Sequence, residues 1–267
     1  MNDQDIVASY HQLLKADEWA DLFGTLETDQ QQDTPRPDVQ KPCPPDAELI
    51  DLIPPEEFSI GRKSVIDVIR QRRSHRFFTE QSFTLEELSF LLWATQGLRA
   101  KVSFDGITYY LRNVPSGGNR HPIETYLNIQ RVEGFAPGLY RYLLLDHRLI
   151  LLKEGAELRE QVNLASLEQV AEHEGKPFYF IRDSAVVFIW SAIPYRTEWR
   201  YGPAGPKLIA LDSGHICQNL YVACGAIDAG TCAVGAFNRR MMDDVLGLDG
   251  EREFSFYMAP VGKILPG

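Results

Sequence analysis

The sequence predicts an α+β fold, and three observations support that prediction. Stretches with apolar residues at helical spacing are interleaved with short apolar runs of strand character. Two of these runs, 139–145 and 149–152, are separated by Asp146 and His147 and therefore indicate a hairpin. Helices and strands do not alternate regularly, which argues against a doubly wound parallel sheet.

Composition and charge place the chain among packed globular proteins. Its residues are 44% hydrophobic and 24% charged, and a chain of 267 residues buries roughly 70–75% of its surface on folding. Lys and Arg total 27 against 37 Asp and Glu, which gives a net charge of −10. This balance argues against a protein that binds nucleic acid or an anionic membrane, whereas a small anionic ligand needs only a local basic patch.

The cysteines and the N-terminus predict a cytoplasmic protein without metal. The four cysteines form no C-x-x-C pair and the histidines lack a second ligand at a known spacing, so no metal site is expected. Cys217 and Cys224 lie between apolar residues and should be buried as small hydrophobic side chains. The acidic N-terminus has no apolar signal segment, and no run approaches ~18 apolar residues, so no membrane span is predicted.

The first 58 residues differ in character from the rest. Apolar residues at helical spacing over 3–24 predict an amphipathic helix. Seven prolines between residues 35 and 55 then disfavour helix and indicate an extended arm. We therefore divide the chain into an N-terminal helix plus proline-rich arm, 1–58, and a main domain, 59–267. Two roles are open for the arm: docking a partner, or wrapping the second protomer of a dimer.

Two helices of the main domain are predicted from capping motifs at their starts. The motifs are Ser64 with Asp67, and Thr84 with the capping-box residue Glu87. The first helix has an apolar stripe and runs into the basic segment 70–76. The second ends at a glycine, the usual residue just past a helix.

The remaining elements are predicted from apolar periodicity. The run 185–190 is continuously apolar and indicates a strand buried on both faces. The segment 206–229 predicts a long helix, apolar around most of its circumference, that belongs in the middle of the fold or in a subunit interface. Helices are also expected over 156–174 and from Asn238 to Leu246, and strands over 126–129, 231–234 and 254–258.

A basic segment is the first candidate binding site. Arg72, Arg73, Ser74 and Arg76 offer planar bidentate donors and a hydroxyl, which is the chemistry that a phosphate group requires. The same residues would also suit the solvated C-terminal end of a helix, where cations complement the helix dipole.

Two glycine-containing segments are candidates for contact with a flat ligand. In 115–118, glycine lets the backbone approach a ligand closely and a serine can donate a hydrogen bond. In 231–237, a short strand ends in Gly235, Ala236 and Phe237, where exposed backbone N–H groups could bond a ring nitrogen or oxygen. Each segment could equally be an ordinary turn or a strand–helix connection.

The segment 195–202 offers reacting groups. Tyr201 could serve as a proton donor and Arg200 as an electrostatic clamp. The alternative is an aromatic-rich loop packed on the edge of the core. No G-x-G-x-x-G or Walker pattern occurs, so neither a Rossmann site nor a P-loop is indicated.

The order of these segments resembles the FMN-dependent nitroreductase-like superfamily. Within it the chain is most similar to the SagB-type branch, which includes the azoline dehydrogenases of thiazole/oxazole-modified peptide pathways. The resemblance covers residues from ~60 to the C-terminus. It rests on the ordered motifs at 72–78, 83–97, 115–124, 199–202, 211–215, 235–237 and 261–262.

The resemblance implies a nitroreductase-like α+β fold with a central, mostly antiparallel sheet wrapped by helices. It also implies an intertwined homodimer with FMN at the subunit interface. The FMN phosphate and ring edge would be held by Arg72, Arg73, Ser74 and Arg76. The partner subunit would contribute Pro115, Ser116 and Gly117, and the strand end facing flavin N5 would be Val234, Gly235 and Ala236.

Two departures from the family pattern bear on function. Azoline dehydrogenases carry a Lys–Tyr pair where this chain has Arg200 and Tyr201, and an arginine stays protonated and cannot act as a base. The basic tail that grips the phosphate in many nitroreductases is replaced by Lys263 alone, so we expect Arg239 or Arg240 to assist the basic segment.

The resemblance therefore predicts an FMN-dependent oxidoreductase that transfers two electrons, as a hydride, at flavin N5. The expected electron donor and co-substrate is NAD(P)H, and the expected substrate is a small conjugated, nitro or quinone compound. Two alternatives are open: an azoline dehydrogenase of a peptide-modifying pathway, and a non-catalytic flavin-binding subunit of such a complex.

Overall fold

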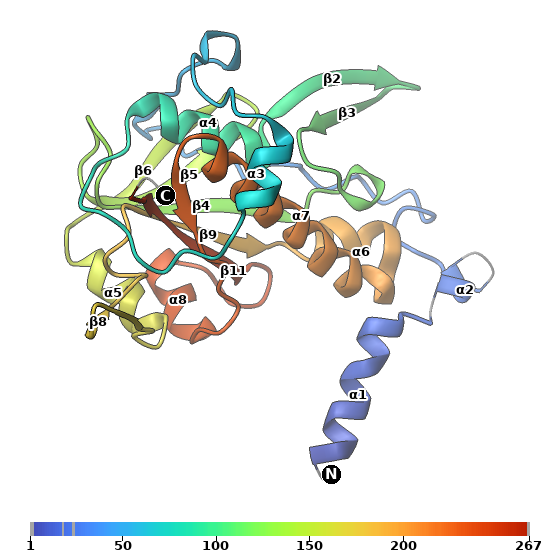
Figure 1. Ribbon diagram of the computed structural model, residues 1–267. Helices are drawn as coiled ribbons and strands as arrows, with labels where there is room; N and C mark the ends of the chain where they lie inside the picture. Colours follow the sequence, from blue (N-terminus) through green and yellow to red (C-terminus); the bar gives the residue numbers. More distant parts are fainter. Residues whose placement is uncertain (1–2, 18, 23–24, 266–267) are drawn as a thin grey trace.

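The computed structural model describes residues 3–17, 19–22 and 25–265 (Figure 1). The predicted helix 3–24 and the outer limits of the two predicted domains extend past these ranges. Residues 1–2, 18, 23–24 and 266–267 therefore lie outside the described part of the chain.

A seven-stranded sheet forms the centre of the molecule, in the order β1-β6-β5-β4-β9-β11-β10. Every neighbouring pair in it is antiparallel, which confirms the predicted α+β class and the mostly antiparallel sheet. The strands are β1 (Leu49–Asp51), β4 (Ile123–Ile129), β5 (Gly138–Leu143), β6 (Arg148–Glu154), β9 (Val186–Ala192), β10 (Ala229–Thr231) and β11 (Phe254–Lys263).

The middle of this sheet is buried on both faces. Every residue of β4 and of β9 is buried, as the continuous apolar run at 185–190 predicted. On one face, α4 (Leu85–Gln96) packs with α7 (Gly205–Ala226), and their side chains share a core with Phe188 of β9. The long apolar helix predicted over 206–229 is therefore confirmed as a central element.

The opposite face is covered by α5 (Leu158–Ala165) and α8 (Arg239–Leu246), which lie side by side in Figure 1. Val162 and Met242 from these helices pack in one cluster with Ile189, the β9 neighbour of Phe188. Successive strand residues point to opposite faces, so β9 supplies apolar side chains to both cores.

Three helices begin at caps that the sequence predicts. The side chains of Ser64, Thr84 and Asn238 each accept a hydrogen bond from the backbone N–H three residues later. They start α3 (Val65–Gln71), α4 and α8, and α4 ends at Gly97 as expected. Each such cap contributes about 1 kcal/mol to helix stability.

The proline-rich arm lies against the main domain and completes one edge of the sheet, because β1 pairs with β6. Arg112 donates a hydrogen bond to the Val39 carbonyl oxygen at 2.8 Å, and Arg141 donates to that of Pro42 at 2.7 Å. Both arginine side chains are buried, so these bonds attach the arm to the interior rather than to the surface.

The N-terminal helices leave apolar surface uncovered. Helix α1 (Asp3–Lys15) projects away from the rest of the molecule, and α2 (Trp19–Leu22) follows it (Figure 1). The apolar stripe predicted on α3 is turned to solvent in the single chain. The exposed large side chains are Val7, Tyr10, Leu13 and Leu14 on α1, and Val65, Ile66 and Ile69 on α3. Exposed apolar faces of this kind mark interaction surfaces.

One predicted helix is much shorter than expected. The prediction of helix over 156–174 is wrong beyond residue 165, where α5 ends. Leu167 and Glu168 follow with φ of 61° and 46°, a left-handed conformation that ends a helix. The chain then forms a hairpin of β7 (Ala171–His173) and β8 (Lys176–Phe178).

A second hairpin was not expected from the sequence. It consists of β2 (Leu98–Phe104) and β3 (Ile107–Arg112), and it extends from the upper right of the molecule in Figure 1. Asp105 and Gly106 form its turn with φ of 51° and 74°. An Asp–Gly pair is the usual sequence of such a two-residue turn, so the signal was present.

The remaining elements are short. One of them is a helix in the segment 195–202, for which the sequence had left a loop open as the alternative. They are α6 (Tyr195–Tyr201) and the 3-10 turns η1 (Pro55–Glu57), η2 (Gly117–Asn119) and η3 (Gly202–Ala204). No helix within the described residues combines the length and the hydropathy that crossing a bilayer requires.

A buried ion pair joins α6 to the sheet. Arg196 donates a hydrogen bond to the Glu124 carboxylate at 2.6 Å, and the two side chains are 4% and 1% exposed. The same carboxylate accepts a hydrogen bond from the backbone N–H of Lys41 in the arm at 2.9 Å. The pair therefore connects three segments that are distant in the sequence.

We predict that Arg196→Met lowers the free energy of unfolding by about 3–5 kcal/mol, because it leaves the Glu124 charge buried without its partner. Urea denaturation measures the effect. The matched control is Arg252→Met, whose side chain is 94% exposed. Such a surface change should stay within about 0.5 kcal/mol. Equal unfolding midpoints for the two variants would contradict the prediction.

Candidate functional site

The basic segment leaves α3 as extended backbone and runs along the edge of the sheet. The change occurs at Arg72, which has φ −56° and ψ 124°. The His75 N–H donates a hydrogen bond to the Thr231 carbonyl oxygen at 2.9 Å, and the Thr79 N–H donates to that of Lys263 at 2.9 Å. The first bond ties the end of the segment to β10, and the second ties the chain just past it to β11.

Two glycines allow this close approach. A Cβ atom on Gly230 of β10 would lie 2.7 Å from the Cβ of His75, and one on Gly262 of β11 would lie 2.6 Å from that of Phe78. Any larger residue would push the basic segment away from the strands. Gly262 belongs to the last motif of the resemblance, and its position gives that motif a physical reason.

Tyr221 of α7 connects the basic segment to the end of the strand region. Its hydroxyl oxygen lies 2.9 Å from Ser74 Oγ and accepts a hydrogen bond from the Ala233 N–H at 2.8 Å. The guanidinium carbon of Arg72 lies 5.4 Å from the centre of the Tyr221 ring. Two segments predicted separately from the sequence therefore meet at one side chain.

The basic segment carries uncompensated positive charge. Arg72, Arg73 and Arg76 are exposed, and none of them forms an ion pair within the described residues. Burial, followed by the charges of Arg73 and Arg72, lowers the pKa of His75, so this imidazole is neutral near pH 7. In a chain of net charge −10, this is a local site for an anion.

Arg76 points toward the same region as Tyr221. Burial raises the pKa of the Cys232 thiol, while the Arg76 charge and hydrogen bonds from Ser74 and Arg76 oppose that shift. Arg76 and Ser74 therefore face the chain just after β10. Cys217 and Cys224 are buried on α7, as predicted.

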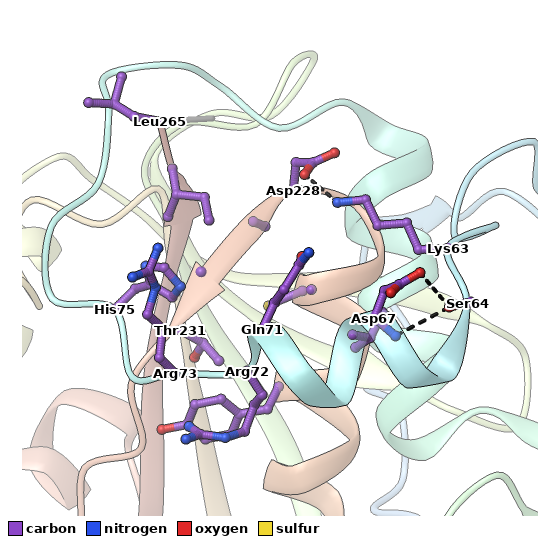
Figure 2. Close-up of a pocket in the computed structure, with 17 residues that line it drawn as sticks. Lys63, Ser64, Asp67, Gln71, Arg72, Arg73, His75, Asp228, Thr231 and Leu265 are labelled. Carbon is purple, nitrogen blue, oxygen red and sulfur yellow. Dashed lines mark hydrogen bonds and ion pairs between the residues drawn. The ribbon is translucent and has the colours of Figure 1, made fainter. Parts of the chain in front are cut away.

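A cavity of about 680 Å³ borders the basic segment. Figure 2 shows Arg73 and His75 on one side of it, with Lys63 and Asp228 across from them. Lys63 pairs with Asp228, so the arginines are the cations left free for a ligand.

The strand predicted over 231–234 is wrong beyond Thr231, where β10 ends, and Val234 forms only an isolated bridge with Met258. Gly235 and Ala236, at the end of this bridge region, present free backbone donors beside the basic segment. Val234 and Met258 exchange two backbone hydrogen bonds, of 2.8 and 3.1 Å. Gly235 and Ala236 then turn outward and are exposed. Among residues 25–265 no acceptor is paired with either of their N–H groups. The nearest atom to a Cβ placed on Gly235 would be 4.0 Å away, so the space in front of it is open.

The predicted segment 115–118 opens a loop, called the Ser116 loop, that runs to His121 and is anchored to α7 through Asp212. Ser116 donates a hydrogen bond to the Asp212 carboxylate at 2.5 Å, and the Gly117 N–H donates to it at 3.2 Å. Ser116 Oγ in turn accepts a hydrogen bond from the His121 N–H at 2.8 Å. Burial raises the pKa of Asp212, and the bonds from Ser116 and Gly117 oppose the rise. Pro115 directly precedes this anchored turn.

Arg200 and Tyr201 lie over this loop, at the end of α6. Gly118 has φ +57°, and a Cβ atom there would lie 2.5 Å from the Tyr201 hydroxyl oxygen and 3.0 Å from Arg200 Cδ. Glycine at this position lets both side chains approach the loop. The predicted reacting groups are therefore next to the predicted glycine-rich segment.

The predicted site residues thus form two groups within one chain. Arg72, Arg73, Ser74 and Arg76 lie with Val234, Gly235 and Ala236 near Tyr221, whereas Pro115, Ser116 and Gly117 lie with Arg200 and Tyr201 near Asp212. Tyr221 and Asp212 are nine residues apart on α7, or about 13.5 Å along a helix axis. One chain does not bring the two groups together.

Sequence reasoning missed the two α7 residues that organise these groups. An acid such as Asp212 inside an otherwise apolar helix was a usable signal, because an unpaired buried carboxylate is costly. Nothing local distinguishes Tyr221 from a core tyrosine. Arg239 ion-pairs with Asp243 and Lys263 with Glu87, so neither is a free cation. Among the described residues, no three His, Cys, Asp or Glu side chains gather as a metal site would need.

Comparison with known proteins finds one family over most of the chain. The family model described as Nitroreductase family matches residues 69–263. A protein of Methanocaldococcus jannaschii, MJ1384, provisionally named a nitroreductase, is 30% identical over 197 residues. The match covers 74% of this chain and 89% of that protein.

Solved structures are similar at the level of the fold. A structure from Anabaena variabilis, provisionally named a nitroreductase, has a TM-score of 0.69 at 22% identity and covers 92% of this chain. The chain spans 46% of that protein. The Escherichia coli microcin synthetase complex McbBCD, with truncated pro-MccB17 bound, contains a chain with a TM-score of 0.56 at 14% identity. That match covers 100% of this chain and 99% of the other.

His121, whose backbone N–H is bonded to Ser116, should make the stability of the protein depend on pH. Burial, followed by the Arg112 charge, lowers the pKa of His121 from 6.5 to about 2, so the native protein keeps it neutral. The unfolded chain takes up a proton as pH falls below about 6.5, and the free energy of unfolding then decreases.

We predict that His121→Gln reduces the loss of stability between pH 7 and pH 5 by about 2 kcal/mol. Urea denaturation at both pH values measures this. The pKa values of His75 and His147 are also lowered by burial, but these residues are present in both proteins and cancel in the comparison. The same pH dependence in variant and wild type would show that His121 does not titrate in this way.

Proposed function

The chain belongs to the nitroreductase family, and from this membership we propose that it is an oxidoreductase with FMN as cofactor, bound at the interface of a homodimer. The nitroreductase-like fold expected from the sequence is confirmed by the solved structures. The proposal for cofactor and dimer is supported by the geometry of the basic segment, the strand end and the Ser116 loop.

The observation that carries the proposal is the junction at Tyr221. It places the free arginines of the basic segment beside a strand end with free backbone N–H groups. In the proposal, Arg72, Arg73, Ser74 and Arg76 hold the FMN phosphate through charge-assisted hydrogen bonds. No carboxylate among the described residues competes with the phosphate for the arginines of this set.

The strand end fits the edge of a flavin ring. A flat ring needs backbone that it can approach closely and a donor that points at it. Gly235 meets the first need because no side chain fills the space in front of it. The exposed N–H groups of Gly235 and Ala236 meet the second. In the proposal they hydrogen-bond flavin N5, and Val234 is held in place by its pairing with Met258.

A second copy of the chain would complete this site. The Ser116 loop lies too far along α7 to reach the basic segment of its own chain. Beside that segment, α3 exposes Val65, Ile66 and Ile69, each more than 60% exposed. We propose that dimer formation covers this apolar face. It would also bring Pro115, Ser116 and Gly117 of one protomer to the flavin held by the other.

FMN, when bound, supplies two-electron chemistry at N5. The chain's own residues bind, orient and donate. In the proposal the arginines fix the phosphate, the strand-end N–H groups orient the ring, and Tyr201 gives a proton to the reduced product. Arg200 stays protonated and stabilises negative charge next to Tyr201.

We propose NAD(P)H as the electron donor and a small conjugated, nitro or quinone compound as the acceptor. Arginine at position 200 supports this choice over a dedicated azoline dehydrogenase, because it cannot remove a proton from a substrate. A base is needed to oxidise an azoline, whereas reduction of a nitro or quinone group needs an acid.

The second candidate is an azoline dehydrogenase of the SagB-type branch, or a flavin-binding subunit of a peptide-modifying complex. It is favoured by the match over the full length of a chain in the peptide-bound McbBCD complex. Steady-state turnover of NAD(P)H with a quinone separates the candidates. A free-standing reductase turns over, and a binding subunit holds flavin without turnover.

We predict that the double variant Arg72→Ala/Arg76→Ala loses bound FMN, because two of the charges that hold the phosphate are removed. The flavin-to-protein ratio after gel filtration measures retention. Arg70→Ala is the matched control, since Arg70 lies on α3 just before these residues, is 74% exposed and pairs with Asp67. A double variant that keeps as much flavin as this control would refute the phosphate assignment.

We predict that Tyr201→Phe keeps FMN but slows the oxidative half-reaction about 100-fold, a typical loss for a positioned general acid. Stopped-flow oxidation of the reduced protein by a quinone measures the rate. Tyr195→Phe is the control on the same helix, because the Tyr195 hydroxyl binds Asp29 instead. Equal rates in all three proteins would leave Tyr201 a purely structural residue.

A further inference from the structure

A second cavity, of about 360 Å³, is lined in part by Gly118 and Arg120 of the Ser116 loop. The arm, β3, the end of the loop and α6 all contribute to its wall. Its most informative lining residues are Arg36, Tyr109, Gly118, Arg120, Trp199 and Arg200. Three of these six are arginines, and this concentration of charge needs an explanation.

Arg120 is the strongest feature of this cavity, because it is a buried cation with unused donors. It is 2% exposed, and its guanidinium lies 4.8 Å from the centre of the Trp199 ring. One nitrogen donates a hydrogen bond to the Asn119 carbonyl oxygen at 3.3 Å. The other two nitrogens are buried and have no acceptor within the described residues. Donors left in this state cost free energy unless a ligand or water accepts from them.

Arg36 brings a second positive charge into the cavity from the arm. It donates hydrogen bonds to the Thr108 carbonyl oxygen at 3.3 Å and to that of Asn119 at 3.0 Å. Its third nitrogen, Nε, is buried without an acceptor in the described part of the chain. Arg36 is therefore held next to Arg120, since both donate to the Asn119 carbonyl oxygen. Carbonyl groups are neutral, so these bonds do not compensate the charge of Arg36.

No carboxylate forms an ion pair with these arginines within the described residues. Asp33 lines the cavity, but within the described residues it forms no ion pair with Arg36, Arg120 or Arg200. Burial, followed by repulsion from Arg36 and Arg200, lowers the pKa of Arg120 to about 10, so it remains charged near pH 7. Three arginines against one aspartate make the lining of this pocket positive in an acidic protein.

We propose that this cavity binds the oxyanion, a carboxylate or a phosphate, of a reactant of the oxidoreductase. The description of the ligand as a reactant rests on the proposed function; the anion site itself does not. Planar guanidinium groups match both oxyanions through paired hydrogen bonds. The rings of Trp199 and Tyr109 lie against the guanidinium groups of Arg120 and Arg36, at 4.8 and 5.1 Å, and help to position them.

The position of the cavity explains how an anchored anion would serve the reaction. Gly118 lines it, and the Tyr201 hydroxyl and Arg200 lie over this residue. A reactant held by its oxyanion at Arg120 and Arg36 would extend past the candidate proton donor. Binding energy from the remote group would then orient the reacting group. The oxyanion has two possible sources, a carboxylate of the substrate or a phosphate of NADPH.

The first experiment measures anion binding without turnover. Isothermal titration calorimetry of the full-length protein, loaded with FMN and at low ionic strength, uses benzoate and inorganic phosphate as probes. Arg36→Met and Arg120→Met should weaken binding by about 10-fold to 100-fold, as expected for loss of charged hydrogen bonds. Arg252→Met, which removes one distant and 94% exposed charge, should bind as the wild type does.

The outcomes of this titration decide the proposal. Wild-type protein that binds neither probe would overturn it, and so would an Arg36→Met variant that binds both probes as the wild type does. Arg36 is only partly buried, so its variant keeps the test valid if Arg120→Met does not fold. A third outcome separates the two proposals. If the wild type shows no flavin and no turnover but binds benzoate, and Arg36→Met loses that binding, the proposed function is refuted and the anion site stands.

The second experiment identifies the source of the oxyanion. The KM values of wild type and Arg36→Met are compared for 4-nitrobenzoate, for the neutral 4-nitrobenzamide and for NADPH. A rise of at least 10-fold for 4-nitrobenzoate alone assigns the site to a substrate carboxylate, and one for NADPH alone assigns it to the nucleotide phosphate. Unchanged KM values for all three would show that the bound anion is not a reactant and would overturn the proposal.

Discussion

The candidate site depends on one buried helix, α7, and on two polar side chains that it carries. Tyr221 ties the basic segment to the end of the strand region, and Asp212 ties down the Ser116 loop. Both groups of candidate residues are therefore attached to α7, which packs in the core with α4 and the sheet. A rigid helix also fixes the separation of the two groups, which is why the proposed site needs a second chain.

Charge is distributed in a way that the net value conceals. The chain is acidic overall, yet its free arginines gather in two places, along the basic segment and around Arg120. Most other buried cations are paired or bonded, as Arg196 is with Glu124 and Arg112 is with Gln96 and Val39. The arginines of the basic segment are exposed and solvated, whereas the unpaired buried nitrogens of Arg120 and Arg36 cost stability in the free protein. That cost favours a ligand that accepts hydrogen bonds from them.

Local features of the fold were predictable, and contacts between distant segments were not. The caps at Ser64, Thr84 and Asn238 act within one turn of helix, so short motifs were enough to find them. The buried strand β9 was found because burial on both faces requires a continuous apolar run. In contrast, the contacts of Tyr221 with Ser74 and of Arg120 with Trp199 join residues far apart in sequence, and no local pattern reports them. The end of α5 depends on left-handed backbone at Leu167, which periodicity does not reveal.

If the Tyr221 junction builds a flavin site in a redox enzyme, the protein must bind a flavin that NADPH can reduce. The most direct test is the visible absorption spectrum of the purified protein, before and after anaerobic addition of NADPH. We expect flavin bands in the resting protein that bleach on addition of NADPH. A protein without flavin bands, even after incubation with FMN, would show that the junction does not bind the cofactor.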